Sequence, residues 1–307
     1  MRPALRPVLQ LIRLPNVFTA AADGLAGWLI VGGRLEDPDR WLPVAMASMA
    51  FYAAGMALND WFDLEVDRAE RPGRPLPSGA VPVRWAAAIG WGGLALGLAL
   101  AAFAGGGFAS SPFAVGVALA AAITGYNAGL KNTPLGPWAM GSCRALNLLL
   151  GAAAGAASDL GGPMVWLAAA AFGAFVAGVT WISRSEAHGG ETRNVKIGLA
   201  IQVAAILAFG AAAVGLAASS KTTTDQPARL IGLIVLAEVL RRAVGAGLRA
   251  VRSPSPAMIQ QAVKSGVLSL VWLDVALVAT ARGPLPALAV AALWPPAFLL
   301  ARRLYAT

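Results

Sequence analysis

Long apolar runs are the feature that most limits how this chain can fold. Runs of roughly 17–25 residues, the length needed to cross the core of a bilayer, occur about ten times. Because 58% of the 307 residues are hydrophobic and only 13% are charged, a soluble globular fold is excluded. We therefore predict an all-α, polytopic membrane protein with about nine or ten transmembrane helices. The expected spans are 14–33, 42–60, 85–104, 112–130, 138–157, 163–183, 196–218, 227–246, 265–281 and 285–303.

The first apolar run could be either a cleaved signal peptide or a transmembrane helix. It carries Asn16 and Asp23 and lacks an Ala-x-Ala cleavage pattern, so we expect a retained helix and not a signal peptide. Ala/Gly tracts in several runs are expected to let helices approach closely. The whole chain, 1–307, is expected to form a single transmembrane domain.

The net charge of +9 would suggest nucleic acid in a soluble protein, but the placement of the basic residues explains it differently. With a cytoplasmic N-terminus, 18 of the 24 basic residues fall on the inner side and Arg144 lies within a span. This bias follows the positive-inside rule, so we expect an integral protein of a bacterial inner membrane that binds no nucleic acid. The five basic residues expected outside are Arg34, Arg40, Lys221, Arg229 and Arg282.

Cysteine and histidine usage limits the chemistry. Cys143 is the only cysteine, so the chain forms no internal disulfide. The only histidine, His188, excludes a site with several histidine ligands. Any bound metal would be a hard cation held by carboxylates, and Mg²⁺ is the default candidate.

The strongest local feature is an acidic cluster at the inner end of the second span. Asp60, Asp63 and Asp67 are spaced i, i+3, i+7, which places three carboxylates on one face of a helix, and Asn59 lies one turn before Asp63. Three aligned anions repel each other, so a positive partner is required, and Mg²⁺ bridging carboxylates to substrate phosphates fits.

The alternative for this cluster is a helix end held by salt bridges to nearby arginines, namely Arg68, Arg71 and Arg74. Glu65 falls on the opposite side of the helix and Glu70 beyond its end, so we expect both to be solvated and leave them out of the site.

With these residues the sequence resembles the UbiA superfamily of intramembrane aromatic prenyltransferases. The family's first motif, Asn-Asp-x-x-Asp-x-x-x-Asp, corresponds to Asn59, Asp60, Asp63 and Asp67. Its Arg-Pro-x-x-Ser-Gly sequel corresponds to Arg74, Pro75, Ser78 and Gly79. The resemblance implies that the motif oxygens hold Mg²⁺ on a prenyl diphosphate, that Arg74 contacts the diphosphate, and that a central cavity opens to the cytoplasmic side.

More of the family pattern follows along the chain. Asn16 matches a polar cavity position, although it could equally cap a helix. Tyr126 and Lys131 match a tyrosine and a basic residue near the diphosphate, while Lys131 could instead be a positive-inside anchor. Arg144 and Asn147 match a polar pair in the fifth span. At membrane depth Arg144 needs an anionic partner, for which we favour the diphosphate or a motif aspartate over a structural partner.

The second family motif, aspartates after the sixth span, is altered here. Aligned on Lys196 and Gly198, the expected aspartates fall near Ser183 and Gly190. The oxygen ligands that remain nearby are Glu186, Glu191 and Asn194. Glu186 is predicted to bind the metal and take part in catalysis, with Ser183 and Glu191 at the substrate. A plain polar loop is the alternative.

Basic residues in the same loop extend this prediction. Arg184, with Arg193, could neutralise the diphosphate in place of the missing acids. His188 is a candidate proton acceptor, and an ordinary loop histidine is an equal alternative.

The resemblance covers about residues 10–282, and the run 285–303 with Pro295 and Pro296 is expected to be an extra crossing or an interfacial helix. The segments GSCRALNLLLGA and ISRSEAHGG are also similar to the UbiA-like subfamily called EboC, which is associated with export of a metabolite precursor. Three isolated acids in the spans receive no role beyond interhelical hydrogen bonds, namely Asp23, Glu238 and Asp274.

The favoured function is a Mg²⁺-dependent transfer of an isoprenoid from a prenyl diphosphate to an aromatic or other lipid-precursor acceptor. The alternative is a non-catalytic protein that binds or exports an isoprenoid or a metabolite. A solute transporter is disfavoured because its acids should lie near the middle of the bilayer and not at one face.

Overall fold

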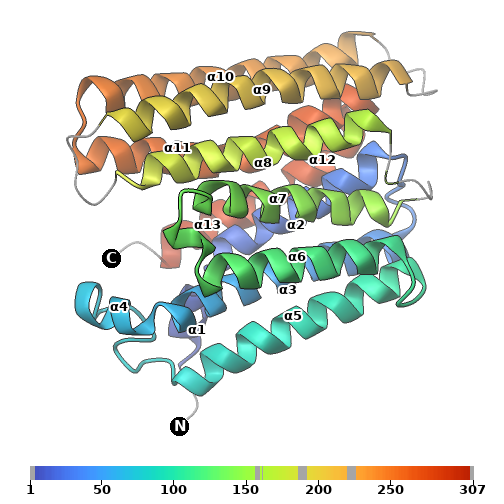
Figure 1. Ribbon diagram of the computed structural model, residues 1–307. Coiled ribbons are helices and arrows are strands. Elements are labelled where there is room, and N and C mark those ends of the chain that lie inside the picture. Colours follow the sequence, from blue (N-terminus) through green and yellow to red (C-terminus); the bar gives the residue numbers. More distant parts are fainter. Residues whose placement is uncertain (1–3, 156–159, 161, 186–191, 220–225, 305–307) are drawn as a thin grey trace.

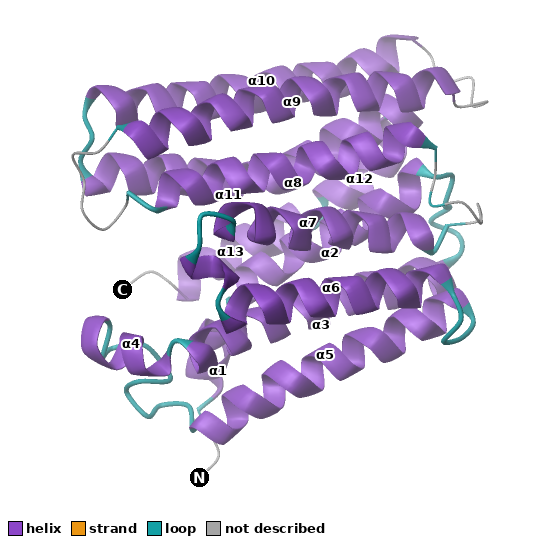
Figure 2. Ribbon diagram, viewed as in Figure 1, coloured by secondary structure: helices purple, strands orange, loops and turns teal. Residues whose placement is uncertain are grey.

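The computed structural model describes residues 4–155, 160, 162–185, 192–219 and 226–304 (Figure 1). In this part of the chain the protein contains only helices, which confirms the predicted all-α fold (Figure 2). The helices are α1 (Leu5–Leu11), α2 (Leu14–Ile30), α3 (Pro38–Phe62), α4 (Leu64–Glu70), α5 (Val83–Gly105), α6 (Ser111–Ala128), η1 (Leu130–Asn132), α7 (Gly136–Ala153), α8 (Pro163–Ser183), α9 (Arg193–Ser219), α10 (Gln226–Arg252), α11 (Pro256–Arg282), α12 (Pro284–Ala291) and α13 (Trp294–Leu304).

The long helices form a bundle in which chain neighbours pack side by side. α2 crosses the interior and contacts α3, α7, α11 and α13, while α9 and α10 lie at one edge and α5 at the opposite edge (Figure 1). The largest fully buried side chains include Trp28, Phe51, Phe172 and Phe209. Most of the buried core consists of Ala, Leu, Val and Ile, and these aromatic residues are its largest side chains.

Glycines allow α2 and α7 to approach with their backbones almost in contact. A Cβ atom on Gly27 would overlap with the carbonyl oxygen of Leu148, and a Cβ atom on Gly151 would overlap with that of Gly24. This arrangement agrees with the close helix packing expected from the Ala/Gly tracts.

Seven segments in the described ranges are long and apolar enough to cross a membrane. α2 is only 17 residues long, and polar side chains lower the hydropathy of α7 and α10. The number of crossings, nine or ten, therefore stays a prediction.

The last apolar run is not one continuous helix. It forms α12 and α13 with a break at Ala292 and Leu293, directly before the Trp-Pro-Pro segment. Pro295 and Pro296 have no N–H to donate to the preceding turn, and their rings clash with its carbonyl groups, which accounts for the break.

The connections that carry the candidate motifs lie at one end of the bundle, which we call the motif end. This end holds α1, α4, the loop 71–82, the connection 129–135 and the end of α8 (Figure 1). The connections 31–37 and 106–110 lie at the opposite end. The expectation that both motif regions lie at the same end is met for the residues that the structure describes.

This arrangement predicts the result of cysteine labelling in a Cys143→Ala background. Ser78→Cys, Ser183→Cys and Ser253→Cys should react with a membrane-impermeant maleimide from the motif-end side, and Ser110→Cys from the other side only. The exposed Ser111, at the start of α6, offers a second site at the opposite end. Ser158, also expected outside, lies beyond the described residues. Reaction of Ser78→Cys and Ser183→Cys from opposite sides of the membrane would contradict the fold.

Candidate active site

The acidic motif lies where α3 ends and α4 begins. The prediction of one continuous helix through all three aspartates is wrong, because Asp63 has φ −91° and ψ 6° and separates the two helices. Three aligned carboxylates repel, and the break lets Asp63 turn toward a different partner from Asp60 and Asp67. Glu65 is exposed and pairs only with Arg68, as expected for a solvated residue.

Arg74 gathers two of the three motif aspartates. Its guanidinium lies 2.7 Å from Asp67 Oδ2 and 3.7 Å from Asp60 Oδ1, and both acids are buried. Leu76, two residues later, anchors the loop in a small apolar cluster with Leu11. The salt-bridge alternative is therefore correct for Arg74, while Arg68 binds Glu65 and none of the motif acids in the described structure.

Lys131 holds the third aspartate. It lies on η1, in the connection between α6 and α7, and its Nζ is 2.6 Å from Asp63 Oδ1. The side chain of Lys131 is only 10% exposed, which does not fit a surface anchor. The structure thus brings the predicted basic residues Arg74 and Lys131 to the acidic motif.

Arg184 extends this basic region from α8. Its guanidinium donates a hydrogen bond to the carbonyl of Thr133 and lies over the ring of Trp181 at 4.9 Å. Arg184 is therefore tied to the connection that carries Lys131. Ser183 instead donates to Thr180 O within its own helix, at 2.8 Å.

Two amide side chains link the motif to α6. Asn59 Nδ2 donates to Asn127 Oδ1 at 3.1 Å, and Asn127 donates to the carbonyls of Gly55 and Ile123. Asn127 was not among the predicted site residues. Its position beside Tyr126, as a polar residue at the end of an apolar run, is the sequence signal that could have identified it.

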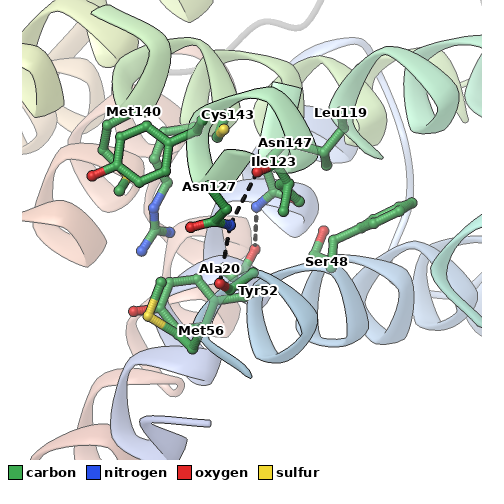
Figure 3. Close-up of a pocket in the computed structure, with 14 residues that line it drawn as sticks. Ala20, Ser48, Tyr52, Met56, Leu119, Ile123, Asn127, Met140, Cys143 and Asn147 are labelled. Carbon is green, nitrogen blue, oxygen red and sulfur yellow. Dashed lines mark hydrogen bonds between the residues drawn. The ribbon is translucent and has the colours of Figure 1, made fainter. Parts of the chain in front are cut away.

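A small cavity lies between α2, α3, α6 and α7 (Figure 3), and Asn127, which binds Asn59 of the motif, is one of its lining residues. Its volume is about 60 Å³, and its walls are mainly apolar. The predicted residues Tyr126, Arg144 and Asn147 line it, whereas the contribution of α2 comes from Ala20, one turn beyond Asn16. The other lining residues are Ser48, Phe51, Tyr52, Gly55, Met56, Leu119, Ile123, Asn127, Met140 and Cys143.

The alternative interpretation of Asn16, as the residue that caps α2, is wrong. The N-cap of α2 is Arg13, and Asn16 lies inside the first turn, where its carbonyl accepts a hydrogen bond from Thr19 at 2.7 Å. Any contact of Asn16 with substrate remains a prediction.

Arg144 has a structural partner in place of the expected motif aspartate. Its guanidinium lies 2.6 Å from Asp23 Oδ2 and donates to Thr19 Oγ1 at 2.8 Å. Asn147 donates to the same Asp23 oxygen at 2.9 Å and to Ala20 O at 2.8 Å. Asp23 is fully buried on α2, so the fifth-span pair serves first to join α7 to α2.

A second pocket opens on the other side of Asp60. It encloses about 330 Å³ and is lined by Gln10, Arg13, Asp60, Gly73, Arg74 and Pro75. Arg13 has a left-handed backbone, with φ 49° and ψ 52°, an uncommon conformation for a residue with a Cβ. Two arginines therefore face this pocket, and sequence reasoning had not selected Arg13.

Ser78 lies away from the acids. It is exposed, and its hydroxyl donates to Pro75 O at 3.3 Å within the loop. Glu186, His188, Glu191 and Gly190 lie outside the described residues, so their predicted roles stay predictions.

The donor set fits a hard divalent cation. Asp60, Asp63 and Asp67 offer carboxylate oxygens, and Asp60 Oδ1 is buried and accepts no hydrogen bond from any of the described residues. Oxygen ligands of this kind, open to a substrate phosphate, are those that Mg²⁺ prefers. Within the described residues, no three such side chains converge on one point: Asp60 and Asp67 share Arg74, whereas Asp63 pairs with Lys131.

Comparison with known proteins supports the assignment of this fold and motif. The profile of the UbiA prenyltransferase family matches residues 21–253. Digeranylgeranylglyceryl phosphate synthase of Metallosphaera sedula is 31% identical over 48% of this chain and 51% of that protein, so the match spans about half of that relative. The enzyme of the same name from Methanoregula boonei is 33% identical over 70% of this chain and 76% of that protein.

Solved structures share the fold. A UbiA homologue from Aeropyrum pernix superposes with a TM-score of 0.64 at 20% identity, covering 85% of this chain and 96% of that chain. A UbiA homologue from Archaeoglobus fulgidus, bound to DMAPP and Mg²⁺, gives a TM-score of 0.51 at 13% identity over 88% and 98%. The resemblance seen in the motif residues is thus confirmed over most of the sequence, and this chain belongs to the UbiA prenyltransferase family.

Proposed function

We propose that this protein is a membrane-embedded, Mg²⁺-dependent prenyltransferase that moves an isoprenoid from a prenyl diphosphate to a lipid-precursor acceptor. The observation that carries the proposal is the position of the paired acids and bases. Asp60 and Asp67 pair with Arg74, Asp63 pairs with Lys131, and Asn59 of the same motif binds Asn127 in the wall of an apolar cavity. A diphosphate head and an isoprenoid tail need these two environments side by side.

In this proposal the basic residues bind the diphosphate. Arg74 and Lys131 each pair with a motif carboxylate, so a cation bound by those carboxylates would free both side chains to contact phosphate oxygens. Bound Mg²⁺ would neutralise charge on the leaving diphosphate. Arg184 is bound to Thr133 in the connection that also carries Lys131, so it could supply a third positive charge to the diphosphate.

The cavity supplies the environment for the transferred carbon. When the allylic C–O bond breaks, the electron pair leaves with the diphosphate, and the positive charge remains on the isoprenoid until the acceptor bonds to it and loses a proton. Tyr52 and Tyr126 line the cavity, and aromatic faces stabilise a cation. The apolar walls also keep water from capturing the cation.

The cavity must enlarge to hold an isoprenoid. Its volume of about 60 Å³ leaves room for only a few water molecules. Met56 and Met140 lie in its wall, and unbranched methionine side chains adapt to new shapes more readily than branched ones. We propose that these two side chains move when the tail enters.

The acceptor proposed is a prenylated glycerol phosphate or a related lipid precursor. The support is the name of the relatives, digeranylgeranylglyceryl phosphate synthase, and the pocket beside Asp60 in which Arg13 and Arg74 could bind an anionic group. The bias of basic residues toward the motif end supports an orientation with this end in the cytoplasm.

One assay tests transfer against simple binding. Purified protein is incubated with labelled prenyl diphosphates of several lengths, Mg²⁺, and a panel of glycerol phosphate and aromatic acceptors. We expect diphosphate release and a prenylated product that depend on both acceptor and Mg²⁺, with EDTA abolishing both.

The binding or export alternative gives a different pattern. In that case the protein binds prenyl diphosphate but releases no diphosphate with any acceptor, and Ser183→Asp combined with Gly190→Asp, which restores the family acids, creates turnover. That pattern would overturn the proposed function.

A further inference from the structure

A groove on the outside of the bundle lies far from the acidic motif, between α10, α11 and the start of α13. It encloses about 440 Å³ and is larger than the cavity between α2, α3, α6 and α7. Its walls are mainly apolar and aromatic, formed by Ile234, Val239, Leu268, Trp272 and Trp294. If each methylene occupied about the ~30 Å³ that a water molecule takes in the liquid, roughly 15 methylenes would fill it.

Exposed apolar side chains flank the groove. Ile234 is 68% exposed and Leu268 is 41% exposed, so apolar surface of α10 and α11 faces outward on both sides of it. Trp272 and Trp294 both line the groove with their ring centroids 5.9 Å apart, and Trp294 stacks on Phe298 of α13. The break between α12 and α13 places Trp294 at this position.

Charged side chains lie at one edge of the groove. Glu238 and Arg242 belong to its lining, and Glu238 binds both Arg242 at 2.6 Å and Arg241 at 2.7 Å. The side chains of Arg241 and Arg242 remain 73% and 60% exposed, so their remaining N–H groups are available to an external ligand. One acid and two bases leave this cluster with a net charge of +1.

The depth of this cluster fits a lipid headgroup. α10 has 27 residues, so it is about 40 Å long at 1.5 Å per residue, compared with about 30 Å for the hydrocarbon core. Its last turn carries Arg249 and Arg252, which places the excess length at the motif end. If α10 is one of the crossings, as the sequence predicts, Arg242 is about one turn below the membrane surface, from which an arginine reaches the phosphates.

We propose that this groove is a binding site for one anionic membrane phospholipid. One acyl chain lies along Ile234, Leu268 and the two tryptophans, and the phosphate accepts hydrogen bonds from Arg241 and Arg242. A phosphodiester carries one negative charge, which matches the net charge of the cluster. A prenyl diphosphate carries more charge and would face Glu238 with no bound cation to balance it.

Native mass spectrometry of the full-length protein tests this site. The protein is titrated in detergent with dioleoyl phosphatidylglycerol and, separately, with dioleoyl phosphatidylcholine, which has the same chains and no net charge. We expect one tight phosphatidylglycerol, bound at least about tenfold more strongly than phosphatidylcholine. Arg241→Ala with Arg242→Ala should remove this preference, whereas Arg249→Ala with Arg252→Ala, which deletes the same charge from the same helix, should retain it.

Replacing Glu238 should strengthen phosphatidylglycerol binding, in contrast to replacing the arginines. Glu238→Gln removes the negative charge from the groove edge and should tighten phosphatidylglycerol binding several-fold, whereas a merely structural ion pair predicts no gain. Trp294→Ala should weaken both lipids alike. Thermal unfolding midpoints of all variants check that the fold is intact.

Three results would overturn the proposal. The first is equal binding of the two lipids to the unmodified protein. The second is loss of the preference in the Arg249→Ala, Arg252→Ala control. The third is displacement of phosphatidylglycerol by another occupant. Displacement by a prenyl diphosphate would assign the groove to a substrate, and displacement by self-association would assign it to a second copy of the chain.

Discussion

Asp67→Asn is expected to weaken Mg²⁺-dependent binding of prenyl diphosphate by at least about tenfold, roughly 1.4 kcal/mol, and to lower kcat/KM further. Asp67 is only 2% exposed and holds Arg74 at 2.7 Å, so the amide removes a ligand charge from the proposed cation site and also the ion pair that positions the guanidinium. Asp63→Asn should have a comparable effect through Lys131. Isothermal titration with and without Mg²⁺ measures the change.

Glu65→Gln is the matched control for these variants. Glu65 lies on the same short helix, α4, but its side chain is 81% exposed and binds only the exposed Arg68, a contact that contributes little. Because the metal is the proposed link, the aspartate variants and the unmodified protein should bind equally weakly in EDTA. Equal losses in Glu65→Gln, or losses that persist in EDTA, would show that the stability of α4 and not cation binding is affected.

Arg144→Leu is expected to lower the free energy of unfolding by about 3–5 kcal/mol, because it leaves a buried charge without its partner. Asp23 is fully buried and, among the described residues, would retain one hydrogen bond, which Asn147 donates at 2.9 Å. Asp274 on α11, also fully buried, interacts electrostatically with both Asp23 and Arg144. In the part of the chain that the structure describes, removal of Arg144 therefore leaves two buried acids without a paired cation.

The double variant distinguishes the buried pair from a substrate contact. Asp23→Asn combined with Arg144→Leu should recover part of the lost stability, because both charges of the pair are removed. Unfolding in detergent followed by tryptophan fluorescence measures the cycle. If Arg144→Leu weakened prenyl diphosphate binding without destabilising the protein, Arg144 would be a diphosphate ligand and the structural role assigned to its pair with Asp23 would be wrong.

The motif residues show what could be predicted from the sequence. The spacing of the aspartates, the loop with Arg74 and the position of Lys131 predicted that acids and bases meet at one end of the bundle, and they do. This worked because membrane crossings alternate in direction, so the ends of even-numbered spans share one side. The prediction of a continuous helix through the motif was wrong. The spacing of the acids contains no information about their basic partners, and Asp63 and Asp67 pair with different ones.

Interior partners were harder to predict. Asp23 and Arg144 are 121 residues apart in the chain, and neither neighbouring sequence indicates the other. Asn127 likewise joins Asn59 across 68 residues. Such pairs depend on which helix faces approach each other. Gly27 and Gly151 permit the close contact between α2 and α7, but the sequence does not show that these two helices are neighbours.

The sequence by itself determined the membrane class, the all-helical fold, the family and the end of the bundle at which the acidic motif lies. These properties follow from apolar run length, charge bias and local spacing, because the bilayer requires every span to satisfy its own backbone hydrogen bonds within a helix. Only the tertiary structure decided which base holds which aspartate, that Arg144 binds Asp23, and that α10, α11 and α13 enclose a groove. Those contacts depend on the rotation and packing of each helix against its neighbours, to which residues distant in the chain contribute together.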